Sequence, residues 1–190
     1  MKNKKWIIIG IVAVVAVILI SSLIGGYNSL VDSQAAVENK QANIQTQLQR
    51  RADLIPNFVA TVKGYSDLEK ETLTAVTEAR SAVGQANDAA SLSQASKQLD
   101  GAISVWVNAV KEAYPDLKSN QNYIALQDEL AGTENRIAIA RQDYNESAQS
   151  YNAMIRKFPK NIFAGIFGFD KVEYFEADEN AQNAPVVSFE

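Results

Sequence analysis

The stretch "QRRADLIPNFVATVKGYSDLE" at residues 49–69 decides how the helices of this chain divide. Pro56 lies inside a run whose apolar residues follow the spacing of an α-helix. Proline lacks the N–H that would bond the carbonyl of residue 52, and its ring crowds that carbonyl, so a helix kinks there. The apolar spacing resumes in register at Phe58 and Val62, which favours a kinked helix over a loop.

The second half of this stretch carries residues that end one helix and start another. Gly64 is followed by Ser66, and Glu69 stands three residues further on, which is the S-x-x-E pattern of a helix N-terminus. Glycine is common just past a helix, so we expect the first helix to end near Lys63 and the next to cover about 67–83. The alternative is a single uninterrupted helix over both segments.

On both sides of this stretch, apolar residues recur at alternating three- and four-residue steps, as in the helices of a bundle. Four helices are expected, at 27–63, 67–83, 88–113 and 120–158. Short loops favour antiparallel neighbours, so we predict an all-α fold: an antiparallel, up-down four-helix bundle with long helices. The expected apolar stripe of the third helix comprises Leu92, Ala95, Leu99, Ala102, Trp106, Ala109 and Ala113.

The expected helix ends carry residues with suitable capping chemistry. Asn87 or Asp88 fits the start of the third helix, and Ser119 or Asn120 fits the start of the fourth. Pro115 cannot continue the third helix, because it has no N–H to bond the preceding turn. The helix boundaries therefore follow from local residue chemistry as well as from the apolar spacing.

The N-terminal segment predicts a membrane anchor. Residues 6–24 carry no charge and are mostly Ile, Val, Leu and Ala. As a helix they span roughly 28 Å, close to the ~30 Å hydrocarbon core of a bilayer. A cleaved signal peptide is the alternative, but its apolar region is shorter, and "SSLIGG" at 21–26 is a poor cleavage site. We therefore expect residues 6–26 to be a retained transmembrane helix in contact with the lipid bilayer.

The charges around the anchor predict its orientation. Lys2, Lys4 and Lys5 precede it, and the next basic residue is Lys40. The positive-inside rule then places the N-terminus in the cytoplasm and the large domain outside the cytoplasmic (inner) membrane. After the anchor, all 22 acidic residues stand against 15 of the 18 basic ones. This negative surplus argues against binding to nucleic acid and against broad attraction to anionic lipid.

The composition removes the commonest catalytic groups. The chain has no cysteine and no histidine, which excludes disulfides, thiolate nucleophiles, the usual zinc sites and Ser-His-Asp catalysis. Its carboxylates also lack the Glu plus Glu-x-x-His pattern of a di-iron bundle. We expect neither an enzyme nor a resident cofactor or metal.

With these features in view, the sequence resembles the LemA family. The matching segments are "YNSLV" (27–31), "QLQRRADLIPNFVATVKGYSDLEKETLTAVTEAR" (47–80), "YPDLKSNQNYIALQDELAGTENRIAIARQDYNESAQSYN" (114–152) and "FPKNIFAGIFGFDKVEYFE" (158–176). They cover most of the chain after the anchor. The family usually has His-Glu where this chain has Leu68-Glu69, so any role of that histidine is absent here.

The resemblance implies a bacterial membrane-anchored protein with a helical-bundle domain and no agreed catalytic activity. Its members include a magnetosome-membrane protein, which suggests membrane organisation. Together with the patterns above, it predicts a cytoplasmic tail at 1–5, an anchor at 6–26, a LemA-like bundle at 27–158, an aromatic-rich short helical segment at 159–176 and a mobile acidic tail at 177–190.

Charged residues form the first set of candidates for an interaction site. The set comprises Arg50, Arg51, Asp53, Glu134, Arg136 and Arg141. Bidentate arginine suits carboxylate or phosphate, so an anion clamp is one interpretation. Arg51 falls on the apolar stripe, however, which favours ion pairs between helices that fix their register. Tyr144 and Tyr151 share one helix face, where packing in the bundle is favoured over a ligand cage.

Large apolar residues in "FPKNIFAGIFGF" form the second set. It comprises Phe158, Ile162, Phe163, Ile166, Phe167 and Phe169. A short helix covering the open end of the bundle and an interfacial membrane segment fit this pattern about equally. An up-down bundle of four helices returns the chain to its starting side, so we expect these residues to contact the membrane or another subunit.

These patterns predict a membrane-anchored, non-enzymatic scaffold or regulatory protein that associates with itself as a homo-oligomer or with other membrane proteins. The alternative is a binding module for a small anionic or peptide ligand between helices. The final "PVVSF" could add a strand to a partner, although a disordered end is favoured.

Overall fold

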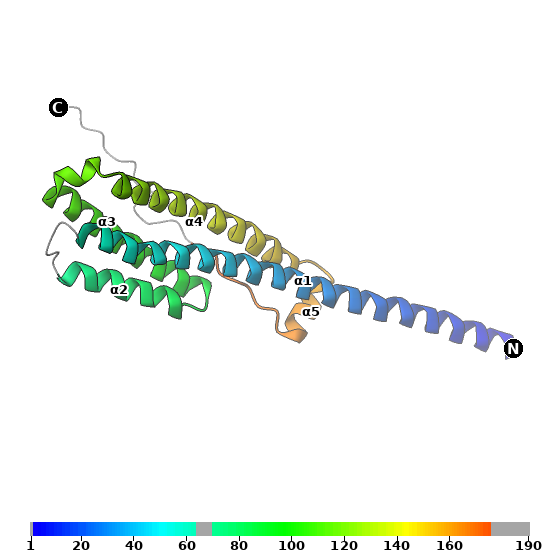
Figure 1. Cartoon of the computed structure of the whole chain (residues 1–190). Coiled ribbons are helices and arrows are strands. Elements are labelled where there is room, and N and C mark those ends of the chain that lie inside the picture. Colours follow the sequence, from blue (N-terminus) through cyan, green and yellow to red (C-terminus); the bar gives the residue numbers. More distant parts are fainter. Residues whose placement is uncertain (1, 64–69, 176–190) are drawn as a thin grey trace, which may run out of the picture. The chain divides into compact units, whose positions relative to one another are not determined.

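The computed structural model of the chain describes residues 2–63 and 70–175. Its elements are α1 (Lys2–Lys63), α2 (Lys70–Gln85), α3 (Ala89–Ala113), the 3₁₀ turn η1 (Pro115–Ser119), α4 (Gln121–Met154) and α5 (Lys160–Phe167) (Figure 1). No strand occurs in these two ranges, and the prediction of an all-α fold is confirmed.

α1 is described up to Lys63 and α2 from Lys70. Gln41 of α1 contacts Asn87 and Asp53 of α1 contacts Arg80 of α2, which one uninterrupted helix over both segments could not do, so that alternative is wrong. α1 also continues through Pro56 without a break. The turn predicted at Gly64 and Ser66 lies outside the described residues, and the kink at Pro56 stays a prediction.

α3 and α4 begin at residues with the expected capping chemistry. The N–H of Ser91 donates to Asp88 Oδ1 at 2.7 Å, and the N–H of Asp88 donates to Ser91 Oγ at 3.1 Å. Asn120 Oδ1 accepts from the N–H groups of Asn122 and Tyr123 at 2.9 and 3.2 Å. These bonds satisfy amides that the first turn of a helix otherwise leaves open.

α4 is shorter than the sequence predicts. The helix expected to reach residue 158 ends at Met154. Beyond it, the N–H groups of Arg156 and Lys157 bond carbonyls three residues back, at 3.3 and 3.2 Å. These bonds tighten the chain into a turn, and Pro159 then disfavours helical geometry in the residue before it.

Contacts divide the chain into two compact units. Unit 1 comprises Met1–Lys40 and Glu146–Val172, and unit 2 comprises Gln41–Asn145 with the residues from Glu173 onward. α1 and α4 each contribute residues to both units. The bundle predicted at 27–158 is therefore shared between them.

In unit 2, α1 and α2 run antiparallel. Gln41 of α1 donates to the carbonyl of Asn87, just past α2, at 3.0 Å. Asp53, further along α1, pairs with Arg80, nearer the start of α2, at 2.8 Å. Residues later in α1 therefore contact residues earlier in α2.

The later helices of unit 2 follow the same rule. Arg141, in the second half of α4, donates to Ser96 near the start of α3. Gln127, near the start of α4, lines the same groove as Val107 near the end of α3, so α3 and α4 run antiparallel. Only residues 86–88 join α2 to α3, which is the short connection of an antiparallel helix pair. In the described part of unit 2, α1 and α2 are thus antiparallel, and so are α3 and α4; the complete up-down bundle stays a prediction.

The core of unit 2 draws side chains from all four helices. They include Ile44, Leu48, Ala52, Ile55, Val76, Ala79, Val83, Leu92, Leu99, Trp106, Tyr123, Leu130, Ile137 and Ala140. The predicted stripe of α3 is wrong in its second half, because Ile103 and Val110 are buried in place of Ala102 and Ala109. The larger side chains occupy the core because the free energy gained on burial grows with apolar area.

In unit 1, α5 packs against α1. Leu30 is buried together with Phe163 and Ala164 of α5, and the partly buried side chains around them are Met154, Ile155 and Phe169. Gly26 allows this close approach, because a Cβ there would lie 3.2 Å from the ring of Phe163. α5 ends at Gly168, whose φ of 73° is a left-handed conformation that glycine adopts without strain.

Candidate functional site

A buried arginine links three helices of unit 2. Arg51 of α1 is only 5% exposed. Its Nη1 lies 3.0 Å from Oδ1 of Asp100 in α3, and its Nη2 lies 3.7 Å from Oε2 of Glu134 in α4. Arg141 of α4 lies 3.8 Å from the other oxygen of Asp100 and donates to Ser96. Because an unpaired buried charge is costly, these carboxylates fix where α1 meets α3 and α4.

The other charged candidates form two groups nearer the surface of unit 2. Glu129 Oε1 accepts from Arg50 at 2.9 Å and from Arg136 at 2.8 Å, which joins α1 to α4. Asp53 pairs with Arg80 of α2 at 2.8 Å. These side chains are largely exposed, so each pair contributes at most about 1 kcal/mol to stability.

The six charged residues singled out from the sequence therefore do not form one cluster. Arg51 and Glu134 pair with each other, while the remaining four pair with Asp100, Glu129 or Arg80. Each of these pairs connects two helices except Glu129–Arg136, which lies within α4. Their arrangement accounts for helix register without a ligand.

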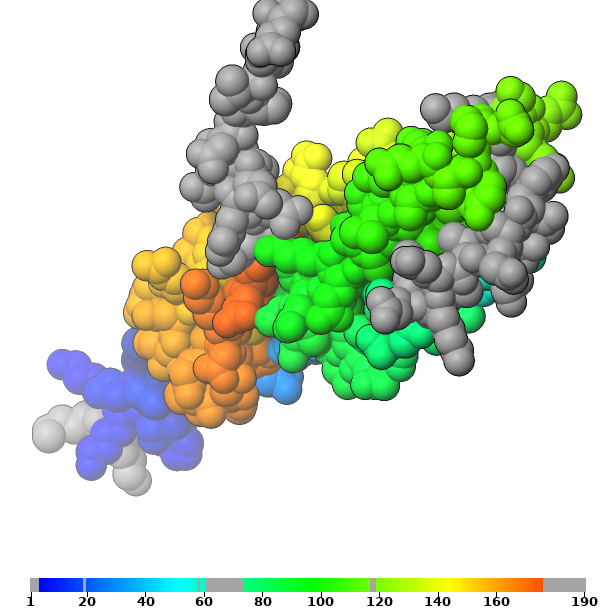
Figure 2. Space-filling view, turned by 90° about the vertical axis from the view of Figure 1, so that its left-hand side faces the viewer, coloured from blue at the N-terminus to red at the C-terminus, as the bar shows by residue number. Residues whose placement is uncertain are grey.

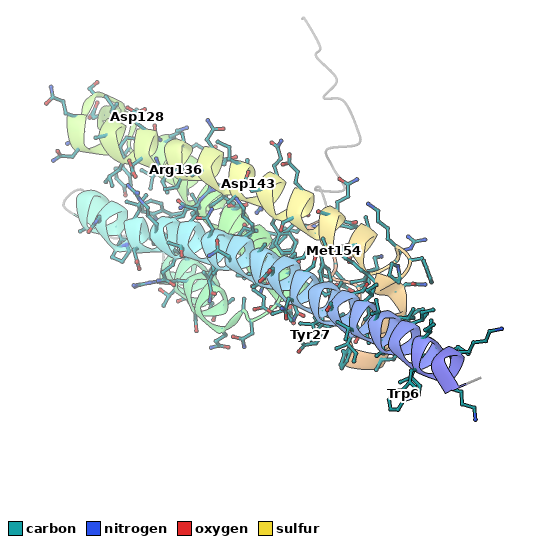
Figure 3. All side chains as sticks on the ribbon, turned by 90° about the vertical axis from the view of Figure 1, so that its right-hand side faces the viewer. Trp6, Tyr27, Asp128, Arg136, Asp143 and Met154 are labelled. Atoms are coloured by element: carbon teal, nitrogen blue, oxygen red, sulfur yellow. The ribbon has the colours of Figure 1, made fainter. Side chains whose placement is uncertain are left out.

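A groove of about 630 Å³ opens beside Arg51. Its charged lining consists of Arg51, Asp100, Lys111, Asp128 and Glu134, and Figure 3 labels Asp128 on the α4 side. Acidic side chains outnumber basic ones here, and Arg51 already engages two of them. The groove therefore suits a cationic or zwitterionic group better than an anion. Within the described ranges, no three acidic side chains gather as metal ligands would.

Asn145 of unit 2 binds the backbone as a neighbouring β-strand would. Its Nδ2 donates to the carbonyl of Phe175 at 2.9 Å, and the N–H of Phe175 donates to its Oδ1 at 2.8 Å. The hydroxyl of Tyr144 donates to the carbonyl of Glu173 at 2.9 Å. Burial, and then the charge of Glu173, raise the pKa of Tyr144, so this hydroxyl keeps its proton at neutral pH.

Asn152 makes the same pair of bonds in unit 1. The N–H of Val172 donates to its Oδ1 at 3.0 Å, and its Nδ2 donates to the carbonyl of Val172 at 2.8 Å. The preceding Tyr151 is buried, and burial followed by the charges of Asp170 and Glu38 raises its pKa. The tyrosine of each Tyr-Asn pair in α4 thus packs in the interior, while the asparagine binds the backbone of the segment after α5.

The apolar candidates around α5 are divided by exposure. Phe163 is buried, and Phe169 is half-buried with its ring 5.7 Å from that of Tyr27. The other four are exposed, namely Phe158, Ile162, Ile166 and Phe167. The orange atoms of α5 accordingly lie at the surface in Figure 2. α5 therefore has one face in the core of unit 1, and Phe167 packs edge to face on Tyr27 with the ring centroids 5.0 Å apart. Phe158, Ile162 and Ile166 form an apolar surface that the described residues leave largely uncovered.

The apolar start of α1 belongs to the same unit. In the described ranges, one helix is long and apolar enough to cross a membrane, and its apolar window is not buried by other parts of the protein. Trp6 projects from this part of α1 in Figure 3 and is 73% exposed. The length of this apolar run matches the hydrocarbon thickness of a bilayer.

Sequence reasoning missed three of the residues that organise these contacts. Asp100 forms ion pairs with Arg51 and Arg141 at 3.0 and 3.8 Å but is not among the candidates from the sequence, although its place directly after the buried Leu99 is a usable signal. Asn145 and Asn152 directly follow Tyr144 and Tyr151, so the sequence repeats a Tyr-Asn pair in this helix. Their seven-residue spacing puts both asparagines on one side of α4, which indicates a shared role.

The chain is similar to a known protein family and to several known proteins. Residues 40–189 match the family model described as the LemA family. Protein LemA of Metamycoplasma hominis is 30% identical over 157 residues, covering 82% of this chain and 71% of that protein.

Two magnetosome proteins are also similar over most of their length. Magnetosome protein MamQ 2 of Paramagnetospirillum magneticum is 28% identical over 206 residues, covering 95% of this chain and 75% of the relative. Magnetosome protein MamQ of Magnetospirillum gryphiswaldense is 27% identical over 197 residues, with coverages of 90% and 72%.

Proposed function

Because the chain belongs to the LemA family, we propose that it is a single-pass protein of the cytoplasmic membrane whose helical part acts as a non-enzymatic scaffold or regulator and associates with itself. The exposed apolar start of α1 supports the membrane anchor. The likeness to two proteins named for the magnetosome supports work at a membrane. The absence of histidine and cysteine from the sequence supports a role without the usual catalytic chemistry.

The three lysines before the apolar run support an orientation with the N-terminus in the cytoplasm. Protease added to intact spheroplasts should then degrade the part of the chain after the anchor. The lysines themselves should become accessible only after lysis. Protection of the large domain until lysis would show the opposite orientation.

The observation that carries self-association is a groove between α2 and α3 of unit 2. It measures about 520 Å³ and is lined by Ala75, Glu78, Ala79, Gln98, Gly101, Ala102 and Val105. Val105 is 63% exposed although it is apolar. Small side chains let another helix approach closely, and copies anchored in one membrane meet at high local concentration. A helix of a second copy fits these conditions.

Single cysteines test this interface, since the chain has none of its own. Oxidation in native membranes should link Val105→Cys into a dimer. Ile139→Cys on α4 is the matched control, because Ile139 is 59% exposed and lies outside the groove lining. Equal amounts of dimer from both variants would contradict the interface.

A second substitution distinguishes a specific dimer interface at this groove from random collisions between copies in the membrane. Gly101→Glu, added to Val105→Cys, should abolish the dimer, because it fills the groove with a charged side chain that an approaching helix would bury, in a lining that already holds the like charge of Glu78. A Cβ at Gly101 meets no atom within 4 Å, so the fold tolerates a side chain there. A dimer that persists in this double variant would show that the groove is not the interface.

The alternative, a small anionic or peptide ligand between helices, has less support. The groove beside Arg51 carries more acidic than basic groups. In its favour, Nε of Arg51 is buried and makes no hydrogen bond to the described residues. A ligand there should raise the melting temperature of the native chain but not that of Arg51→Ala, whereas self-association makes the melting temperature depend on protein concentration.

A further inference from the structure

We infer that α5 and the turn before it form a second contact with the bilayer, in which the exposed apolar face of α5 enters the interfacial layer and nearby cations bind anionic lipid headgroups. The inference rests on the proposed anchor, because α1 must hold α5 at the membrane. It goes beyond the anchor by assigning a partner, a lipid surface, to residues outside the spanning segment.

The place of α5 along α1 matches the edge of a bilayer. The uncharged run of α1 ends at Ile24, and α5 packs on α1 at Gly26 and Leu30. At a rise of 1.5 Å per residue, these contacts lie roughly 3 to 9 Å beyond the run. The polar layer on each side of the hydrocarbon core is roughly 5 to 8 Å thick. α5 therefore lies at the depth of that layer.

The two apolar faces of α5 have different surroundings. Phe163 and Ala164 pack on Leu30, whereas Ile162 and Ile166 on the other face are 49% and 69% exposed. Phe158 and Phe167, at the two ends of the segment, are 81% and 57% exposed. A short helix that is apolar on its outer face and held against a membrane anchor partitions into the interface, because its side chains leave water there.

The charges next to α5 suit anionic headgroups. No acidic residue occurs between Glu146 and Asp170, whereas Arg156, Lys157 and Lys160 do. Arg156 and Lys157 are exposed in the turn, and Nζ of Lys160 donates to Ser29 Oγ of α1 at 2.7 Å. This local positive charge differs from the negative surplus of the chain after its anchor. The sequence argument against broad attraction to anionic lipid therefore does not extend to this turn.

Spin labels on single cysteines measure the depth of α5 in the full-length protein. The label positions are Ile166→Cys and Phe167→Cys on α5, Ile139→Cys as the equally exposed control in unit 2, and Val14→Cys as the reference inside the anchor. Each variant is reconstituted into nanodiscs with one copy per disc and about a third anionic lipid. Relaxation by oxygen reports apolar surroundings, and relaxation by a water-soluble nickel complex reports water.

Labels at 166 and 167 should be protected from the nickel complex and relaxed by oxygen, at a depth between those of positions 14 and 139. Nickel access equal to that at 139 would overturn the inference while leaving the anchor intact. Water access at 14 would overturn the anchor and the inference together. Protection at 166 that appears only in crowded liposomes, and not in single-copy discs, would show that a second copy covers this face instead.

Neutralising Arg156 and Lys157 tests whether these cations bind anionic lipid headgroups. The depth at 166 should be greater with anionic than with zwitterionic lipid, and Arg156→Gln with Lys157→Gln should remove at least half of that difference. Lys97→Gln with Lys111→Gln removes the same charge from α3 and should leave it unchanged. Equal effects of the two pairs would mean that only net charge acts, and the proposed headgroup contact would be wrong.

Discussion

Asn152 makes both backbone hydrogen bonds to Val172, accepting from its N–H at 3.0 Å and donating to its carbonyl at 2.8 Å. Asn152 is 5% exposed, so water cannot readily replace these bonds. A helix side chain here supplies the donor and the acceptor that an adjacent strand would supply. The extended segment after α5 is thereby held to α4 within unit 1.

Asn152→Ala should release this segment. Two hydrogen bonds are lost, and we expect the free energy of unfolding to fall by about 1–3 kcal/mol. Hydrogen exchange at the amide of Val172 should accelerate, which mass spectrometry can follow. Gln149→Ala, at an exposed position of the same helix, should change stability by less than about 0.5 kcal/mol. Unchanged exchange at Val172 would contradict the role of Asn152.

Gly26→Val should separate α5 from α1. A Cβ at residue 26 would lie 3.2 Å from the ring of Phe163, and the two methyl groups of valine need still more room. We expect stability to fall by about 1–3 kcal/mol through overpacking, with higher hydrogen exchange in α5. Gly25→Val is the matched control, since a Cβ there meets nothing within 4 Å. Equal effects of the two valines would mean that close packing at Gly26 is unimportant.

Adjacent arginines should differ sharply in their contribution to stability. Arg51→Met leaves Asp100 without its closest cation, and we expect a loss of about 1–3 kcal/mol in the free energy of unfolding. Arg50→Met removes only an exposed pair with Glu129 and should cost less than about 1 kcal/mol. Chemical denaturation of both variants in detergent measures the difference. Similar losses would show that burial of Arg51 does not govern its effect.

The cap of α3 should make its first turn sensitive to acid. The bond from the N–H of Ser91, followed by the Ser91 side chain, lowers the pKa of Asp88. A carboxyl with a lowered folded pKa stabilises the fold above its ordinary pKa of about 4 and loses this effect as pH falls through the folded value. The protection factor of the Ser91 amide, taken relative to its intrinsic exchange rate at each pH, should therefore fall as the solution is acidified below about pH 4.

Asp88→Asn is the control for this acid response. Asparagine is also a good N-cap but has no proton to gain in this range, so the first turn should stay capped as pH falls. Asp88→Ala should instead weaken the turn at every pH. An acid response of equal size in the Asn variant would assign it to another group.

The helices were predictable because their signals are local. Apolar spacing, the proline at 115 and the capping residues Asp88 and Asn120 act within a few residues of one another. The end of α4 was less predictable, because the apolar spacing continues to Phe158 while the backbone has already turned after Met154. Apolar spacing alone does not distinguish a helical position from an exposed residue in a following turn.

The ion pairs depend on how each helix is rotated about its axis and aligned along its neighbours. The apolar pattern determines both only coarsely. Arg51 was recognisable as buried from its place on the stripe, but its partner Asp100 lies on a helix whose stripe was assigned one residue off at Ile103 and Val110. A shift of one residue turns a helix face by about 100°. The partner of a buried charge therefore could not be chosen from the sequence without the packed structure.

Asn145 and Asn152 hold their partners through main-chain groups, which every residue except proline presents in full. A change of side chain at Val172 therefore leaves both bonds available. At Phe175 the freedom is smaller, because its ring meets that of Tyr144 edge to face at 5.1 Å. This attachment thus depends on the side-chain identity of the two asparagines of the helix more than on the side-chain identity of residue 172.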